Sequence, residues 1–318
     1  MISQTNHNKI IKIGTRGSKL ALVQANWVAD QIRSHHPDTE VALVIIKTTG
    51  DKILDVPLAK VGGKGLFVKE IEDALQDRRV DLAVHSMKDV PTEIPAGLGI
   101  RVITEREDPR DVLISHQDDG VRGLPLSARV GTSSLRRQAQ IKTFRKDLIV
   151  LPLRGNLDTR VKKLIQGEYD AVILAAAGLN RLAPDLGEKK VSYLNLEDFI
   201  PAVGQGALGI EMRLNDIDSY ESASFLNHPK TAAAVAAERA FLITLEGGCQ
   251  VPIGGLAQLD NGRVHLSAFI ADPEGEQLIR GTDAAPLGQE AILGVRLARH
   301  LLDQGGREIL RRIYQFQG

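Results

Sequence analysis

The first 46 residues alternate between strand-like and helix-like segments, and this alternation limits the folds open to the chain more than any other feature. Residues 9–14 have strand character, and residues 20–35 place apolar side chains at helical spacing, with Pro37 just beyond their end. Residues 41–46 form an apolar, β-branched run that is typical of a buried strand. A strand, a helix and a second strand in this order predict a parallel sheet with a crossover helix.

Two further units follow along the chain. The second starts near Arg106 and alternates in the same way, with strands expected at residues 112–115, 129–131, 148–153 and 171–174. From about Lys230 the pattern changes to an alanine-rich helix, a glycine-rich loop, and strands separated by the turn residues DNG and DPEG. The sequence therefore predicts an α/β fold of two lobes with mainly parallel sheets, followed by a small C-terminal α+β domain.

Composition excludes several classes of partner. Forty basic residues balance forty acidic ones, so net charge gives no reason to expect nucleic acid or an anionic membrane surface. No apolar run approaches the roughly 20 residues that a membrane-spanning helix needs. The polar start MISQTNHNK does not have the apolar centre of a secretory signal. A single cysteine favours the reducing cytoplasm.

That cysteine, Cys249, lies in the stretch LEGGCQVPIG. Two glycines precede the sulfur and Pro252 follows it, so the loop can hold one side chain at a fixed place. A lone cysteine forms no intrachain disulfide and is too few for a zinc or iron–sulfur site, so no metal centre is expected. Two interpretations stay open here: a small buried apolar residue, or a nucleophilic thiol.

Lys88 and Asp89 follow the strand expected at residues 81–85, at the end where open α/β sheets place their ligands. An aspartate there can also serve as a turn or helix-cap residue, and a lysine as a solvated charge. Before this strand, residues 47–67 are rich in glycine and lysine and show no period, which indicates a mobile loop. Their GGKG does not complete a phosphate-loop pattern.

Several arginines lie just beyond expected strand ends. Ser133 or Ser134 can cap the helix that starts in GTSSLRRQAQ, and the free amides of a helix start attract anions. Arginine binds carboxylates and phosphates through two parallel hydrogen bonds. The set predicts a ligand with many such groups, and we do not expect Arg136 and Arg137, as part of an anion site, to lie in the core. The arginines are Arg136, Arg137, Arg154, Arg160 and Arg181.

Nine ordered blocks of sequence carry a resemblance to a known family. The blocks are TRGSKLALVQA, KTTGD, LAKVGGKGLFVKE, AVHSMKDVP, EREDPRD, VGTSSLRRQ, LRGNLDTR, PAVGQGALGIE and EGGCQVPIG. Together they resemble the porphobilinogen deaminases, also called hydroxymethylbilane synthases, over nearly the whole chain from about Lys12. One departure is Lys19, where the family often has proline, and it places a charge at the start of a helix near the expected site.

The resemblance implies three domains, the first two similar to the halves of periplasmic solute-binding proteins. The expected domains are residues 1–104 with 206–225, residues 105–205, and residues 226–318. The implied transferase joins four porphobilinogen molecules head to tail with loss of ammonia and releases linear hydroxymethylbilane, a precursor of haem and other tetrapyrroles. Its implied cofactor is dipyrromethane, held on Cys249 through a thioether. It is expected to be a cytoplasmic monomer whose partners are porphobilinogen and the growing oligopyrrole, with no nucleic acid or membrane.

The resemblance also implies roles for residues of this sequence. Asp89 faces the pyrrole nitrogens and stabilises the cation formed on deamination, with Lys88 as its catalytic neighbour. The residues implied to bind the cofactor are Cys249, Lys88, Asp89, Thr132, Ser133, Ser134, Arg136, Arg137 and Gly178. Those implied to bind the substrate are Arg16, Ser18, Gln24, Lys60, Lys64, Phe67, Arg154, Arg160, Arg181 and Gln205. Phe67 and residues 47–65 would act as a lid.

Two other classes of protein share some of these features. A two-lobed small-anion binding protein without catalysis has the same architecture but needs neither Cys249 nor a reducing compartment. A thiol hydrolase needs a histidine partner for its cysteine, and none is identifiable from the sequence. The mass of the intact protein separates these classes, because only a covalent cofactor adds to it.

Overall fold

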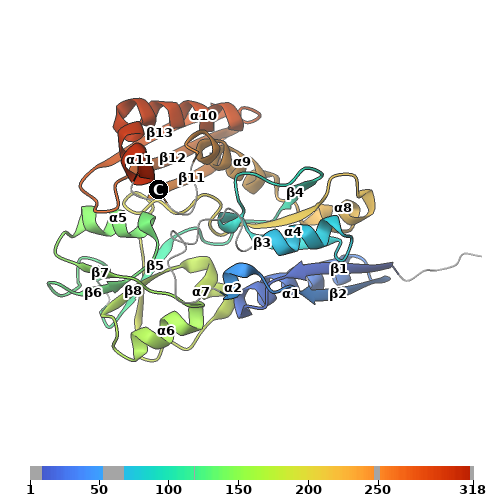
Figure 1. Ribbon diagram of the computed structural model, residues 1–318, viewed down its shortest axis with the longest axis horizontal. Helices are drawn as coiled ribbons and strands as arrows, with labels where there is room; N and C mark the ends of the chain where they lie inside the picture. Colours follow the sequence, from blue (N-terminus) through green and yellow to red (C-terminus); the bar gives the residue numbers. More distant parts are fainter. Residues whose placement is uncertain (1–8, 53–67, 118, 247–250, 316–318) are drawn as a thin grey trace, which may run out of the picture.

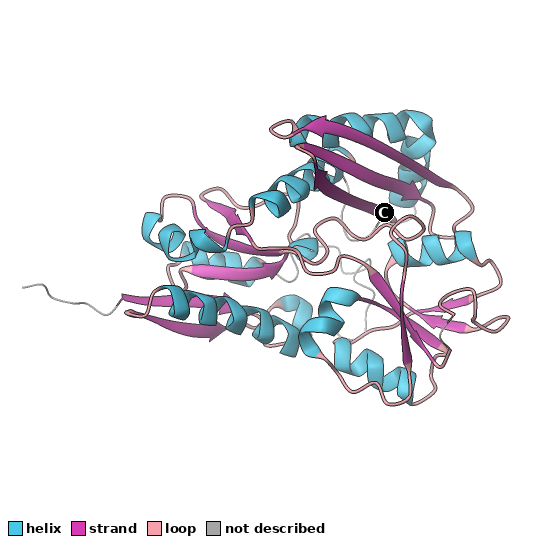
Figure 2. Ribbon diagram, turned by 180° about the vertical axis from the view of Figure 1, so that it is seen from behind, coloured by secondary structure: helices cyan, strands magenta, loops and turns pink. Residues whose placement is uncertain are grey.

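The computed structural model describes residues 9–52, 68–117, 119–246 and 251–315, arranged in three parts that are each built around one sheet (Figure 1). Two lobes lie side by side along the long axis of the molecule. The C-terminal part lies over the second lobe in both views (Figures 1 and 2). The predicted two lobes and C-terminal α+β domain are therefore confirmed. Within the described ranges, no helix combines the length and apolar character that crossing a bilayer requires.

The first lobe has a five-stranded sheet in the order β2-β1-β3-β10-β4. Its strands are β1 (Lys9–Thr15), β2 (Thr39–Ile45), β3 (Leu82–Ser86), β4 (Leu98–Ile103) and β10 (Leu208–Arg213). Because β1 runs parallel to β2 and β3, and only β10 is antiparallel to its neighbours, four of these strands point the same way. The expected parallel opening is confirmed.

Two helices sandwich this sheet. Helix α1 (Lys19–His35) begins at the cap Ser18 and packs Val28 and Ile32 against one face, whereas α4 (Lys69–Gln76) packs Ile71 and Leu75 against the other. The remaining helical segments of this lobe are α2 (Thr49–Lys52), η1 (Met87–Asp89), α8 (Ile217–Ala223) and η2 (Ser224–Leu226). The short helix η1 directly continues the end of β3.

The second lobe repeats this plan, with strand order β7-β6-β8-β5-β9. Its elements are β5 (Asp111–Ser115), β6 (Arg129–Gly131), α5 (Leu135–Phe144), β7 (Ile149–Leu151), α6 (Leu157–Ile165), β8 (Ala171–Ala175), α7 (Ala176–Leu182) and β9 (Lys190–Tyr193). Again one strand, β5, opposes its neighbours. The sequence pattern does not indicate β4 or β9, since both lie at sheet edges where partial exposure blurs the apolar pattern.

The third part is an antiparallel sheet, β11-β12-β13, covered by helices. Its elements are α9 (Pro229–Thr244), β11 (Ile253–Asp260), β12 (Arg263–Ala271), β13 (Leu278–Pro286), α10 (Glu290–Leu301), η3 (Leu302–Gly306) and α11 (Arg307–Gln315). Phe241 of α9, Leu266 of β12 and Leu297 of α10 are buried in one core. The hairpin arrangement predicted from the turn residues is confirmed.

Both connections between the lobes are fastened to the third part by one buried carboxylate. Oε1 of Glu238, on α9, accepts hydrogen bonds from Arg106 at 2.8 Å and from the amide of Ala257 at 2.8 Å, and Oε2 accepts one from the amide of Gly204 at 2.7 Å. Arg106 lies on the connection after β4 and Gly204 on the connection before β10. The domain boundaries expected from the sequence stay predictions.

Candidate functional site

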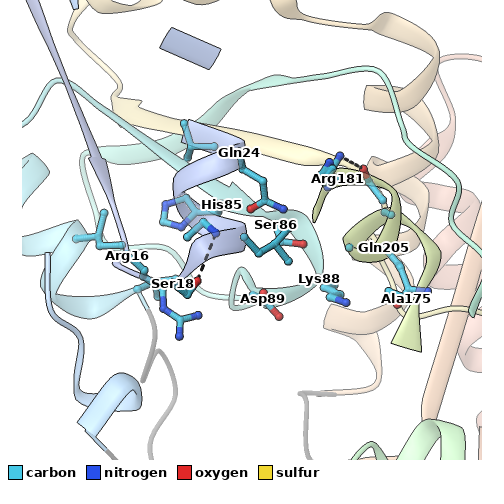
Figure 3. A pocket seen from close by; sticks show the side chains of 18 residues that line it. Arg16, Ser18, Gln24, His85, Ser86, Lys88, Asp89, Ala175, Arg181 and Gln205 are labelled. Carbon is cyan, nitrogen blue, oxygen red and sulfur yellow. Dashed lines mark hydrogen bonds between the residues drawn. The ribbon is translucent and has the colours of Figure 1, made fainter. Parts of the chain in front are cut away.

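A pocket opens between the two lobes, and side chains from both surround it (Figure 3). The first lobe contributes the start of α1 and the end of β3, and the second contributes α7. Eight of the residues assigned to the site from the sequence line it: Arg16, Ser18, Gln24, Lys88, Asp89, Gly178, Arg181 and Gln205. Residues that are up to 189 positions apart in the sequence are therefore brought together.

The turn that carries Lys88 and Asp89 is anchored by the residue before them. Met87 is 1% exposed, and its amide donates to the carbonyl of Ala207 at 3.0 Å. Gly204, with φ of +72°, approaches so closely that a Cβ there would lie 2.7 Å from Cβ of Met87. Because this close approach fixes the turn, Lys88 and Asp89 are held at the pocket, where Lys88 is half-buried and Asp89 is exposed.

The charges around Lys88 act on one another. Burial lowers the pKa of Lys88 to about 8; the charge of Asp89 opposes this effect, and that of Arg137 adds to it. Burial likewise lowers the pKa of Arg160 to about 10, with the charge of Arg137 acting in the same direction and that of Asp89 opposing it. The cationic and acidic residues predicted for the site therefore share one electrostatic environment.

Arg136 and Arg137 have a buried counter-ion. Nη1 of Arg136 lies 2.8 Å from Oδ2 of Asp111, and Nη2 of Arg137 lies 2.8 Å from Oδ1 of the same carboxylate. Burial by itself would raise the pKa of Asp111, but the two guanidinium groups outweigh it and hold that pKa well below its usual range. The arginines are only 5% and 7% exposed. The expectation that they lie outside the core is therefore wrong, because β5 supplies a carboxylate that makes their burial possible.

Other predicted ligands already make bonds within the protein. As helix caps, Oγ of Ser18 accepts a hydrogen bond from the backbone amide of Ala21, and Oγ of Ser134 accepts one from that of Arg137. The predicted cap of α5 is therefore confirmed. Ser133 bonds to the backbone of Leu153, and Oγ1 of Thr132 accepts from the amide of Ser134. A hydroxyl that accepts such a bond keeps its own proton to donate, so Ser18, Ser134 and Thr132 can still bind an anion.

Arg160, Arg181 and Gln205, also predicted as ligands, donate hydrogen bonds to backbone carbonyls. Arg160 donates to Gly155 at 2.8 Å, Arg181 to Gly206 at 2.8 Å, and Gln205 to Pro109 at 2.7 Å. Gln205 donates in addition to Oδ1 of Asp111 at 2.9 Å. These bonds orient the side chains, and each guanidinium has further N–H groups that can bind a carboxylate.

The lobes meet where α1 and α7 approach each other. A Cβ at Gly178 would lie 3.3 Å from Leu157 and 3.6 Å from Leu20, so this glycine permits the approach but does not itself supply a polar ligand. Lys19, the residue that departs from the family pattern, lies 2.7 Å from Asp158 of α6 and thus adds a salt bridge between the lobes. Because Lys19 is 73% exposed, we expect this bridge to contribute little.

Four predicted residues lie outside the described ranges: Cys249, Lys60, Lys64 and Phe67. The predicted lid falls mostly on residues 53–67 and is outside them too. Conversely, the sequence pattern does not single out Asp111, although the residue belongs to the block EREDPRD. It also misses Glu211, a carboxylate inside the apolar run LGIEMR that could have been noticed as an unusual buried charge.

The donor set fits a group that carries several carboxylates. Lys88 and Arg160 lie within electrostatic reach of other cations, Arg136, Arg137 and Arg154, as well as of the carboxylates of Asp89 and Asp111. Cations gathered this closely in a buried or half-buried setting repel one another, and an anionic ligand would reduce that repulsion. Dipyrromethane, built from two rings that each bear an acetate and a propionate, would supply that negative charge.

Comparisons with known proteins agree over nearly the whole chain. The family described as porphobilinogen deaminase, dipyromethane cofactor binding domain, matches residues 11–221, and the porphobilinogen deaminase C-terminal domain matches residues 232–303. The chain is 53% identical to porphobilinogen deaminase of Syntrophobacter fumaroxidans, covering 97% of this chain and 99% of that protein. It is 54% identical to that of Geobacter metallireducens, covering 96% of each. A putative methionine-binding lipoprotein of Bacillus subtilis is a structural neighbour with a TM-score of 0.42 and 11% identity, covering 69% of this chain and 90% of that one.

Proposed function

This chain belongs to the porphobilinogen deaminase family, and from this premise we propose how its own residues share the reaction. The enzyme is a transferase that acts on porphobilinogen and uses a dipyrromethane cofactor. The observation that carries the assignment of roles is one exposed carboxylate, Asp89, in a pocket that both lobes line and that also holds Arg16, Lys88 and Arg181.

The cations hold the carboxylates of the cofactor and of the growing chain. Arg136 and Arg137 share one negative charge from Asp111, so together they keep an excess positive charge for a ligand. Lys88, Arg154 and Arg160 extend this basic surface, and Thr132, Ser133 and Ser134 add neutral donors. Cys249 carries the cofactor through a thioether, because a thiolate is the natural group to capture an electrophilic pyrrole. When bound, the cofactor supplies the pyrrole carbon to which the first substrate is joined.

The substrate lies against the remaining lining of the pocket. Arg16 and Arg181 come from opposite lobes and bind its acetate and propionate, Ser18 and Gln24 donate further hydrogen bonds, and Oε1 of Gln205, which has no partner among the described residues, accepts one. Lys60, Lys64 and Phe67 remain part of the proposal as residues of a lid over this position.

Asp89 stabilises the transition state of deamination. Loss of ammonia from the aminomethyl group leaves a cation spread over the pyrrole ring. A fixed negative charge next to the ring favours this cation over the neutral substrate, and a group held in place beforehand needs no reorganisation when the charge develops. The anchored turn at Met87 provides that fixed position for Asp89.

Replacement of Asp89 tests these roles. Asp89→Asn keeps the shape but removes the charge, so we expect turnover to fall at least about 10³-fold, since one preorganised group contributes about 10²–10³ and proton transfer about 10²–10⁴. Asp89→Glu keeps the charge and should be milder. If Asp89 serves only as a turn residue, Asp89→Asn loses about 1 kcal/mol of stability with a near-normal rate. An Asn variant that melts lower yet keeps a tenth of the activity removes Asp89 from the mechanism.

The same proposal includes a monomer that works in the cytoplasm. A single cysteine suits a reducing compartment. Sedimentation velocity across a wide range of protein concentrations tests the oligomeric state, and a dimer at working concentration contradicts it.

A further inference from the structure

A second group of ionisable side chains lies just behind the pocket. His85 is the penultimate residue of β3 and lines the pocket. Glu211 of β10 and Glu72 of α4 do not belong to the pocket lining. Their exposed fractions are 6%, 2% and 8%. None of the roles proposed above uses them.

The sheet register brings His85 and Glu211 together. His85 pairs with Gly209 and Ala83 pairs with Glu211, so His85 and Glu211 lie diagonally on the same face of the sheet. Nε2 of His85 is 2.9 Å from Oε2 of Glu211. Figure 3 shows His85 among the side chains of the pocket, near Gln24 and Ser86.

Stability does not explain this cluster. The same face of the sheet is covered by apolar residues of α4, Ile71 and Leu75, and it could have been apolar throughout. Instead it holds two acidic groups and a histidine, and Oε1 of Glu211 has no hydrogen-bond partner among the described residues. Burial, and next the charge of Glu211, raise the pKa of Glu72 to about 7. Such buried charges are commonly costly to a fold and gather at functional sites.

The hydrogen bond determines which ring nitrogen can act as a base. A carboxylate oxygen only accepts hydrogen bonds, so in the contact with Oε2 of Glu211 the proton lies on Nε2 of His85. In the neutral ring Nδ1 then carries a lone pair that can accept a proton. Nδ1 and Nε2 lie on different edges of the ring, and Glu211 contacts the Nε2 edge. This is the arrangement in which a carboxylate fixes the tautomer of a histidine and stabilises its protonated form.

We propose that His85 is the base that removes the proton from the pyrrole ring each time a new carbon–carbon bond has formed, with Glu211 as its positioning residue. The proposal rests on the deaminase function described above. Asp89 keeps a separate task, because it must stay charged beside the cation while the new bond forms.

The bonds and charges of the step balance. The incoming aminomethyl group is protonated as an ammonium, its C–N bond breaks, and the electron pair of that bond leaves with ammonia. The free α-carbon of the terminal pyrrole then bonds to the resulting cationic methylene carbon. The C–H bond at that α-carbon breaks, its electron pair restores the aromatic ring, and the proton passes to Nδ1 of His85. Transfer of this proton to ammonia, which departs as ammonium, returns His85 to its neutral form.

The test uses porphobilinogen with deuterium on the free α-carbon. His85→Gln keeps an amide that can donate to Glu211 but removes the base. We expect turnover to fall about 10²–10³-fold, within the range for general base catalysis, with KM changed much less. Proton removal then limits the rate, so the ratio of rates with light and deuterated substrate rises above the wild-type ratio. Glu211→Gln should show a smaller fall and the same rise in the isotope effect.

Matched variants make the result decisive. Asp216→Asn also removes a carboxylate that pairs with β10, through Arg213, but it lies outside the pocket lining and should leave the isotope effect unchanged. Asp89→Asn slows C–N cleavage, so its isotope effect should not rise.

Intact mass and thermal melts establish that each variant holds its cofactor and is folded, and Glu211→Gln decides the question if His85→Gln does not fold. Slower turnover without a larger isotope effect overturns the proposal, and an effect that rises only in Asp89→Asn assigns the base to Asp89.

Discussion

Asp111→Asn is the substitution whose effect the structure defines most closely. The carboxylate is 1% exposed and lies between Arg136 and Arg137, with 2.8 Å contacts to both. An asparagine keeps one oxygen for Gln205, which donates to Oδ1 of Asp111 at 2.9 Å. Its amide group, however, turns two donor hydrogens toward an arginine that is itself a donor. The variant thus loses both ion pairs and leaves two buried cations uncompensated.

The expected cost follows from that burial. Removing one partner of a buried ion pair typically costs about 3–5 kcal/mol, because the remaining charge stays desolvated. We expect a loss of this size in the free energy of unfolding, measured by guanidinium chloride denaturation of the cofactor-free protein. The loss should be smaller in protein that holds its cofactor, because bound carboxylates supply part of the missing negative charge.

The dependence on pH gives a second measurement. The pKa of Asp111 is held below its usual range in the folded protein, so its contribution is complete above the unfolded pKa of about 3.9 and disappears as the pH falls toward the folded value. The stability difference between wild type and Asp111→Asn should therefore be constant near neutral pH and shrink in acid. A difference that grows as the pH falls contradicts the assigned direction.

Glu308→Gln is the matched control. Glu308 also pairs with two arginines, Arg311 and Arg312, at 3.2 Å each, but all three side chains lie exposed on α11. Its replacement should change stability very little, since water already screens these charges. If both substitutions cost the same, or if Asp111→Asn costs less than about 1 kcal/mol, buried charge compensation is not what holds the two arginines in place.

Three further predictions concern the cofactor, the lysine at the pocket and the connection between the domains. Purified protein should be heavier than its sequence by one dipyrromethane, and Cys249→Ser should remove the excess; an active protein with the bare sequence mass contradicts the thioether. Lys88, whose pKa is lowered to about 8, loses its charge as the pH rises through that value, so KM for porphobilinogen should increase between about pH 7 and pH 9 and stay flatter in Lys88→Arg. Glu238→Gln loses the bond from Gly204 and the negative charge that compensates the mostly buried Arg106, so denaturation should show a loss of about 3–5 kcal/mol, similar to that of Asp111→Asn.

The sequence alone determines the local elements and the family. The apolar period of residues 20–35 and the β-branched run before residue 46 depend only on near neighbours, and α1 and β2 form close to where they are expected. The ordered motifs likewise indicate a deaminase with an arginine-rich site, and Lys88 and Asp89 do lie at the carboxyl end of a strand. Edge strands such as β9 escape this kind of prediction because their exposure weakens the period.

The tertiary structure alone decides which charges meet. Asp111 and Arg137 are 26 positions apart, and His85 and Glu211 are 126 apart, so no local pattern relates them. They meet because β5 lies beside the start of α5 and because β10 inserts next to β3 after the chain has crossed to the second lobe and returned. The strand order decides whether a buried arginine meets a carboxylate that balances its charge, and whether a histidine forms a hydrogen bond to one. The low dielectric of the protein interior makes these contacts energetically important.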